Sequence, residues 1–210
     1  MISPYGADKL NSLFIDDEHD RLVAKENARY LNDLIISPSA VANVVMLGSG
    51  YFTPLTGFMN KSDALSVAVN LYTESGLFWP IPIVNLIKHE KPIKVGKPLA
   101  LRDPSIGGNP VIAIQDVESV EYLTDREINT ILINIFSTTD VKHPGVATFL
   151  GLGKTLVAGP LRVVNFSYFT EAFPGIFETA QEIRNDIVSR GWTTVVAFQT
   201  RNPMHRHHEE

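Results

Sequence analysis

The chain has 210 residues, of which 44% are hydrophobic and 20% charged, a balance typical of folded globular proteins and unlike that of disordered chains. Its formal net charge of −5 argues against broad electrostatic binding to nucleic acid or to an anionic membrane. It contains no cysteine, which excludes disulfides, thiolate metal sites and a cysteine nucleophile. We find no secretory leader and no apolar run of about 18 residues, so we expect a cytoplasmic protein without membrane contact.

Two short helices and a turn-rich segment are predicted in the first third of the chain. Ser37 as N-cap, Pro38 at the first helical position and Gly48 just past the end define the first helix. Residues 48–59 mix glycine, proline and aromatic side chains, which favours a compact loop packed by its own rings over a strand. The second helix is expected over residues 62–71.

The middle of the chain, residues 79–122, has the pattern of a small sheet or barrel, because short apolar runs alternate with prolines and glycines. These runs are 81–87, 98–101 and 111–117. A further strand pair is expected over 155–165, with its turn at Gly159 and Pro160.

A capping box predicts the start of another helix. Thr124 is followed three residues later by Glu127, so each side chain can bond the other residue's backbone N–H. Apolar residues then recur at helical spacing, at Ile128, Ile131, Leu132 and Ile135. The helix is therefore expected over about 125–136.

The last part of the chain has a different pattern. One helix face, ending at Gly191, is marked by Phe177, Ala180, Ile183, Ile187 and Val188. Residues 193–198 form an uninterrupted apolar run typical of a buried strand in a parallel sheet. This succession opens a doubly wound α/β unit, whose ligand crevice lies beyond the carboxyl ends of its strands. We therefore place two domains, at residues 1–168 and 169–210.

A polar segment directly follows the predicted strand and carries the candidate chemistry. His205 and His208 lie three residues apart, so they share one face if a helix begins there, and a helix N-terminus binds anions. Arg201 offers a fork of N–H donors that fits a tetrahedral oxyanion, and Gln199 and Asn202 add neutral donors. The segment therefore predicts a phosphate-handling site in which charge is stabilised without a covalent intermediate.

Other interpretations of the same residues remain open at this point. Two histidines at this spacing also occur at a solvated helix end. His205 with Glu209 resembles half a zinc site, although no third ligand is evident, and the final residues could be an engineered metal-chelating tail. We expect no metal bound by the protein's own side chains.

Four segments together carry a resemblance to a known family. Residues 199–208 resemble the QxRNPxHxxH signature of ATP sulfurylase (sulfate adenylyltransferase), a nucleotidyltransferase. Residues 54–59 resemble its PLxGFM segment, residues 143–146 its HPGV segment, and residues 191–198 the strand that leads into its active site. In combination they are far more specific than a lone HxxH pair.

The resemblance implies an α+β and α/β chain, with a PUA-like mixed β-barrel N-terminal domain and then the start of a doubly wound, Rossmann-like nucleotidyltransferase domain. It implies transfer of AMP from ATP to sulfate, giving adenosine 5′-phosphosulfate and pyrophosphate, with Mg²⁺ entering on ATP. It assigns sulfate to Gln199 and Arg201, and nucleotide to Gln199, Asn202, His205 and His208. It assigns catalysis to Arg201, His205 and His208. The full-length protein is expected to be a homo-oligomer.

The sequence departs from the family pattern in two respects. His207 occupies a position where the family commonly has a small residue, often alanine. The downstream catalytic segments that the resemblance implies are absent from these 210 residues. We therefore expect a truncated chain that is inactive by itself, because part of its ligand crevice is missing.

A PUA-like RNA-binding module without catalysis is the alternative function. The acidic balance opposes it, since no basic stripe interleaved with aromatic residues is present. Tyr51, Phe52 and Phe58 are accordingly expected to pack between domains rather than to stack on bases.

The two other matched segments receive structural roles. Gly57 and Gly145 are expected to supply backbone conformations closed to other residues, and Pro144 to fix a turn. For His143 we favour a hydrogen-bonded position in that turn over an approach to the nucleotide.

Overall fold

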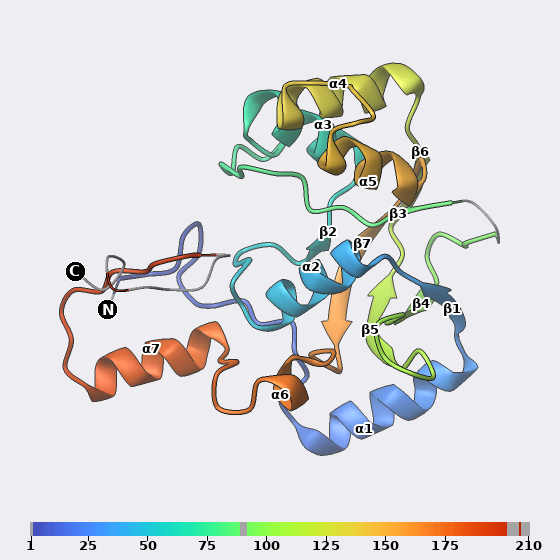
Figure 1. Cartoon of the computed structure of the whole chain (residues 1–210). Coiled ribbons are helices and arrows are strands. Elements are labelled where there is room, and N and C mark those ends of the chain that lie inside the picture. Colours follow the sequence, from blue (N-terminus) through green and yellow to red (C-terminus); the bar gives the residue numbers. More distant parts are fainter. Residues whose placement is uncertain (1, 89–91, 201–205, 207–210) are drawn as a thin grey trace.

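A computed structural model describes residues 2–88, 92–200 and 206. Within them, a curled seven-stranded mixed sheet is flanked by helices at opposite ends (Figure 1). Helices α3, α4 and α5 gather at one end, α1 and α6 lie at the other, and α7 stands to one side (Figure 1). The helical elements are α1 (Glu18–Asn27), η1 (Ala28–Tyr30), α2 (Pro38–Gly48), α3 (Lys61–Asn70), α4 (Asp125–Phe136), α5 (Pro144–Leu152), α6 (Phe169–Ala172) and α7 (Ala180–Ser189).

The sheet is organised around its last strand. The order is β1-β4-β5-β7-β2, and β3 and β6 also pair with β7. Only the β1–β4 pair is parallel among the pairs of named strands in the described residues. The strands are β1 (Asn32–Ile35), β2 (Gly57–Phe58), β3 (Leu86–Ile87), β4 (Pro98–Arg102), β5 (Val111–Asp116), β6 (Ser119–Tyr122) and β7 (Thr155–Val163).

Strand β7 corrects the prediction of a strand pair that turns at Gly159 and Pro160. The strand is continuous, and these two residues pair with Phe58 and Gly57 of β2. Gly159 has a φ of 136°, so the strand bends there without reversing. Residues before the bend pair with β3 and β6, and residues after it pair with β5. Tertiary pairing on both sides thus overrides the local turn signal.

The helix predictions based on caps are confirmed. The Ser37 hydroxyl accepts from the N–H of Ala40 at 3.2 Å and starts α2. Thr124 and Glu127 form both bonds of the capping box that starts α4. Gly48 is the last residue of α2 rather than the first beyond it, and a Cβ there would meet Val163 Cγ1 at 2.8 Å. This glycine therefore allows α2 to pack closely on the sheet.

The strand predictions succeed in part. The runs 98–101 and 111–117 form β4 and β5, whereas only the last two residues of the run 81–87 form a strand, β3. The predicted loop 48–59 contains the short strand β2. The expected mixture of helices and a small mixed sheet is confirmed.

Three apolar clusters stabilise this arrangement. The main core lies between α2 and the sheet and includes Val44, Leu101 and Val157. A second core joins α4 and α5 to the start of β7, and a third packs η1 against β4 and β5. Residue Val157 belongs to the main core and its neighbour Leu156 to the second, as expected for side chains that alternate along a strand.

The predicted buried strand over residues 193–198 is wrong. These residues form neither helix nor strand, and Val196 and Phe198 are 94% and 59% exposed. A buried strand needs neighbouring strands and covering helices, and this run pairs with none of the strands in the described residues. Helix α7 does form, but it begins at Ala180 behind its own capping box, so Phe177 lies before it.

Gly159→Ala tests the bend in β7. A Cβ at this position would lie 2.1 Å from Asp116 O, and the φ of 136° is strained for other residues. We expect a loss of about 2–4 kcal/mol in unfolding free energy, measured by chemical denaturation. Gly107→Ala is the control, because nothing lies within 4 Å of a Cβ there. Equal stability of the two variants would contradict the role assigned to the bend.

Candidate functional site

The structure describes only part of the predicted anion-binding segment. Gln199 is exposed, Thr200 is half-buried, and neither belongs to a helix or strand. Arg206 is exposed and lies in a 3₁₀ turn. The other predicted residues lie outside the described residues, namely Arg201, Asn202, His205, His207, His208 and Glu209. Their roles remain predictions. The three alternatives for this segment, an anion site, a solvated helix end and a metal-binding tail, also remain open.

Helix α7 precedes this segment, and its start is fixed by a second capping box. The N–H of Thr179 donates to Glu182 Oε2 at 2.7 Å, and the N–H of Glu182 donates to Thr179 Oγ1 at 3.3 Å. The backbone bond from Thr179, followed by the bond from its hydroxyl, lowers the pKa of Glu182. This box was not predicted from the sequence, although Thr179 and Glu182 show the same spacing as Thr124 and Glu127.

Backbone atoms attach α7 to the N-terminal part of the chain. The N–H of Ala180 donates to Ser49 O at 2.9 Å, and the Tyr51 hydroxyl donates to Glu178 O at 2.8 Å. One turn further along α7, Arg184 Nη1 donates to Ile2 O at 2.9 Å. The residues after α2 therefore position the first turn of the helix that precedes Gln199.

Aromatic packing extends this contact. The rings of Phe166 and Phe177 lie 5.2 Å apart, and Phe166 also stacks on Phe14 at 4.3 Å.

Burial raises the pKa of Tyr51, and the negative charges of Glu178 and Glu182 raise it further. Tyr51 thus remains a hydrogen-bond donor in the ordinary pH range.

Packing between domains was predicted for three aromatic residues, and the prediction is wrong for two of them, Phe52 and Phe58. Tyr51 lies between α7 and the N-terminal part of the chain, as expected. Phe52 instead packs edge-to-face on Trp79 with centroids 5.6 Å apart, and Phe58 is buried in the main core. The rings of Phe52 and Phe58 are therefore engaged within the N-terminal part.

The HPGV segment forms the start of α5. His143 is its N-cap, with Nδ1 accepting from the N–H of Val146 at 3.4 Å, and Pro144 occupies the first turn. The favoured assignment of His143 to a hydrogen-bonded turn is confirmed. A Cβ on Gly145 would lie 2.6 Å from the Phe136 ring.

The expectation that Gly57 and Gly145 provide special backbone conformations is wrong. Neither residue has a left-handed φ. A Cβ on Gly57 would lie 2.1 Å from Gly159 O, so what both positions require is the absence of a side chain. Close approach of neighbouring atoms, rather than dihedral freedom, selects glycine here.

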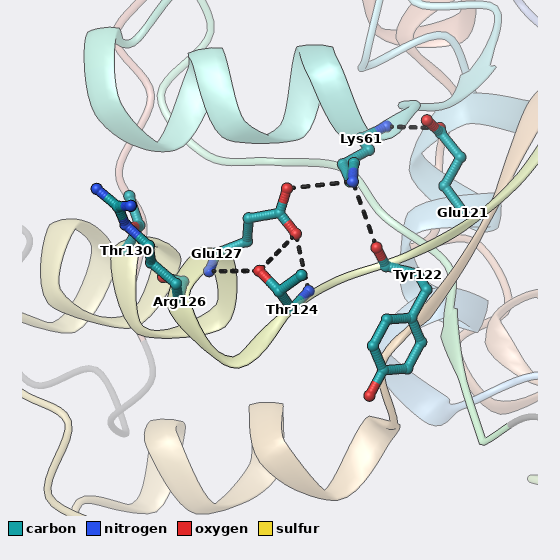
Figure 2. A network of polar contacts seen from close by, with 7 residues as sticks. All are labelled: Lys61, Glu121, Tyr122, Thr124, Arg126, Glu127 and Thr130. Atoms are coloured by element: carbon teal, nitrogen blue, oxygen red, sulfur yellow. Dashed lines mark hydrogen bonds and ion pairs between the residues drawn. The ribbon is translucent and has the colours of Figure 1, made fainter.

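A polar network joins α3, β6 and α4 (Figure 2). Lys61 Nζ lies 3.1 Å from Glu127 Oε1, while the Lys61 backbone N–H donates to Glu121 Oε2 at 2.9 Å. The pKa of Glu127 is lowered, chiefly by the backbone bond from Thr124 and further by Lys61. The capping carboxylate therefore also ties two helices together, which the capping-box pattern by itself did not predict.

A separate cavity of about 950 Å³ lies between β1, the segments flanking residues 89–91 and the end of α5. Its walls are mainly apolar, and Asp33, Lys88 and Lys94 contribute the charged side chains. No predicted site residue within the described part of the chain lines it. In that same part, no group of three or more His, Asp or Glu side chains is placed to hold a metal ion, and no helix is both long and apolar enough to span a membrane.

Family models match nearly the whole chain. A model described as a PUA-like domain matches residues 2–166, and the chain therefore belongs to the PUA-like domain family over this range. The model described as ATP-sulfurylase matches residues 174–210, and the resemblance to that family deduced from the four segments is confirmed.

Relatives and a solved structure agree with these matches. A sulfate adenylyltransferase of Alcanivorax borkumensis is 53% identical over 210 residues, covering 100% of this chain and 52% of the relative. One of Allochromatium vinosum is 48% identical, with 100% and 53% coverage. A structure titled "Hexameric APS kinase from Thiobacillus denitrificans" matches with a TM-score of 0.72 and 27% identity, covering 100% of this chain and 36% of that one. The chain thus spans about half the length of the curated relatives it matches.

Glu127→Gln tests the capping carboxylate. A carboxylate with a lowered pKa stabilises the folded state above its ordinary pKa of 4.5, and this contribution is lost as the pH falls through the lowered value. We expect the unfolding free energy to fall by about 1 kcal/mol at pH 7. This difference should shrink as the pH drops below 4.5, and denaturation at several pH values measures it. Arg126→Gln, on the same turn, controls for charge removal. A pH-independent difference would contradict the assignment.

Tyr51→Phe tests the attachment of α7. Removing the hydroxyl leaves Glu178 O without its donor, and we expect the free energy that holds α7 in place to fall by about 1 kcal/mol. We expect the amide of Ala180, bonded to Ser49 O, to exchange its hydrogen about fivefold faster. Tyr30→Phe is the matched control, because Tyr30 is 84% exposed. Unchanged exchange at Ala180 would show that the tyrosine does not hold the helix.

Proposed function

We propose that the protein represented by this chain is a sulfate adenylyltransferase that transfers AMP from ATP to sulfate. The products are adenosine 5′-phosphosulfate and pyrophosphate. The observation that carries the proposal is the 53% identity to a sulfate adenylyltransferase across all 210 residues. The match of residues 174–210 to the ATP-sulfurylase model supports it, because that range includes the whole signature segment.

The proposed chemistry follows from the charges of the reactants. A sulfate oxygen attacks the α-phosphorus of ATP while the bond from that phosphorus to the departing pyrophosphate breaks. Sulfate and triphosphate repel each other, so the main task of the protein is to position two anions and to neutralise charge in the transition state. Mg²⁺ enters with ATP as part of the substrate.

Within this proposal each signature residue has a role. Arg201 and Gln199 bind sulfate, and Arg201 suits this because its planar fork matches a tetrahedral oxyanion. Asn202 and Gln199 contact the nucleotide. His205 and His208 face the phosphates that separate, where imidazoles stabilise the developing negative charge.

We extend the proposal to the organisation of the protein. A domain boundary at 168/169 is supported by family matches that end at residue 166 and resume at residue 174. A homo-oligomeric full-length protein is supported by the matched structure, whose title describes a hexamer. We further propose that the protein binds ATP and acts in the cytoplasm, in sulfate assimilation.

Arg201→Ala tests the catalytic assignment. We suggest a chimaera in which residues 1–210 replace the matching half of the Alcanivorax borkumensis relative, assayed for pyrophosphate release from ATP and sulfate. Loss of one preorganised donor to a developing anion costs about 10²–10³-fold in rate, and we expect a loss of this size. Arg29→Ala, at an exposed position next to Glu26, is the control. An unaffected rate for Arg201→Ala would refute the sulfate role.

The 210-residue chain alone is expected to give no turnover in the same assay. The chain covers only 52% of the Alcanivorax borkumensis relative. Ligand crevices in doubly wound folds are built from the ends of several strands. Residues 193–198 are exposed instead of being covered by neighbouring strands. Measurable pyrophosphate release from this chain would overturn the expectation.

A further inference from the structure

Two amide side chains lie inside the apolar core without full hydrogen bonding. Asn85 and Gln115 are both 0% exposed. Gln115 Nε2 donates to Val157 O at 3.1 Å. Within the described residues, Asn85 Nδ2, Asn85 Oδ1 and Gln115 Oε1 have no partner. Buried polar atoms of this kind are rare in folded proteins, and an internal water is a common reason for them.

Asn85 and Gln115 both bond the same residue of β7, Asn85 through its backbone carbonyl and Gln115 through its side-chain amide. Val157 donates its N–H to Asn85 O at 3.0 Å and accepts from Gln115 with its own carbonyl. Asn85 therefore reaches Val157 from the segment that leads into β3, and Gln115 reaches it from β5. Strands β7 and β5 and the segment before β3 thus meet at this residue, two positions before Gly159.

Alternation of side chains places both amides on the same side of the sheet. Gln115 lies directly opposite Leu99 of β4, and Leu99 belongs to the main core. Around Asn85, residues Ile83 and Ile87 belong to the main core, whereas Leu86 belongs to the second. Asn85 and Gln115 therefore both face the main core, where apolar neighbours supply no hydrogen bonds.

The unpartnered atoms are chemically complementary. Asn85 Nδ2 is a donor and Gln115 Oε1 an acceptor, yet they do not bond to each other. A molecule that joins them must accept one hydrogen bond and donate another, and must be small enough for a packed core. Water meets these requirements. Neither side chain lines the 950 Å³ cavity, so exchange with bulk solvent through that opening is not direct.

We propose that Asn85 and Gln115 form an internal binding site for at least one ordered water molecule. The water accepts from Asn85 Nδ2 and donates to Gln115 Oε1. It links the approach to β3 with β5 where both meet β7, and it fixes the side-chain orientation of two amides that the protein alone leaves incompletely paired.

A crystal structure of the 210-residue chain, at a resolution that orders internal waters, tests the proposal directly. We expect a water within hydrogen-bond distance of both side chains. Water-to-protein NOEs from the Asn85 and Gln115 side-chain amides test the same site in solution. A direct bond between Asn85 and Gln115, or a site without water, would overturn the proposal.

Apolar variants give a second readout by magnetic relaxation dispersion, which counts long-lived internal waters. The double variant Asn85→Leu/Gln115→Met is expected to lose at least one such water. Ser49→Ala is the control, because the buried Ser49 hydroxyl already donates to Val45 O at 2.8 Å, and its count should not change. An unchanged count in a folded double variant would contradict the proposal. If the double variant does not fold, the structure and NOEs of the unaltered chain decide.

Discussion

The close approach of three backbone segments at Gly159 is the constraint on which the fold depends. A Cβ there would lie 2.1 Å from Asp116 O, and a Cβ on Gly57 would lie 2.1 Å from Gly159 O. Because no side chain intervenes, β7 passes between β2 and β5 and changes its pairing at the bend. The main core and the second core both form along this strand, and α2 packs on its end through Gly48 and Val163.

Features encoded by a side chain and a nearby backbone group were predictable from the sequence. Ser37 and the Thr124–Glu127 pair start their helices as their spacing indicates, because each cap involves residues only three positions apart. Features set by distant pairing were not. Gly159 and Pro160 resemble a turn, yet β2 and β5 hold them in one strand. Residues 193–198 have a buried-strand pattern, but burial depends on neighbours that an apolar run does not supply.

The candidate site shows the same division. The signature of residues 199–208 identifies the family from side-chain identity alone, and the matches to family models confirm the resemblance. The bonds that attach α7 use the carbonyls of Ser49 and Glu178, and every residue has a carbonyl, so no sequence pattern marks them. Asn85 and Gln115 likewise sit in ordinary strand-like sequence, and only the folded topology brings them to Val157.

The position of β7 in the chain affects how the protein is made. It follows β2, β3, β5 and β6 in the chain, and all four use it as a shared partner. The nascent chain therefore carries several apolar segments with open edges until residues 155–163 emerge. Such late, long-range closure slows folding and exposes intermediates to aggregation. These open strand edges are thus exposed during synthesis until β7 has been made.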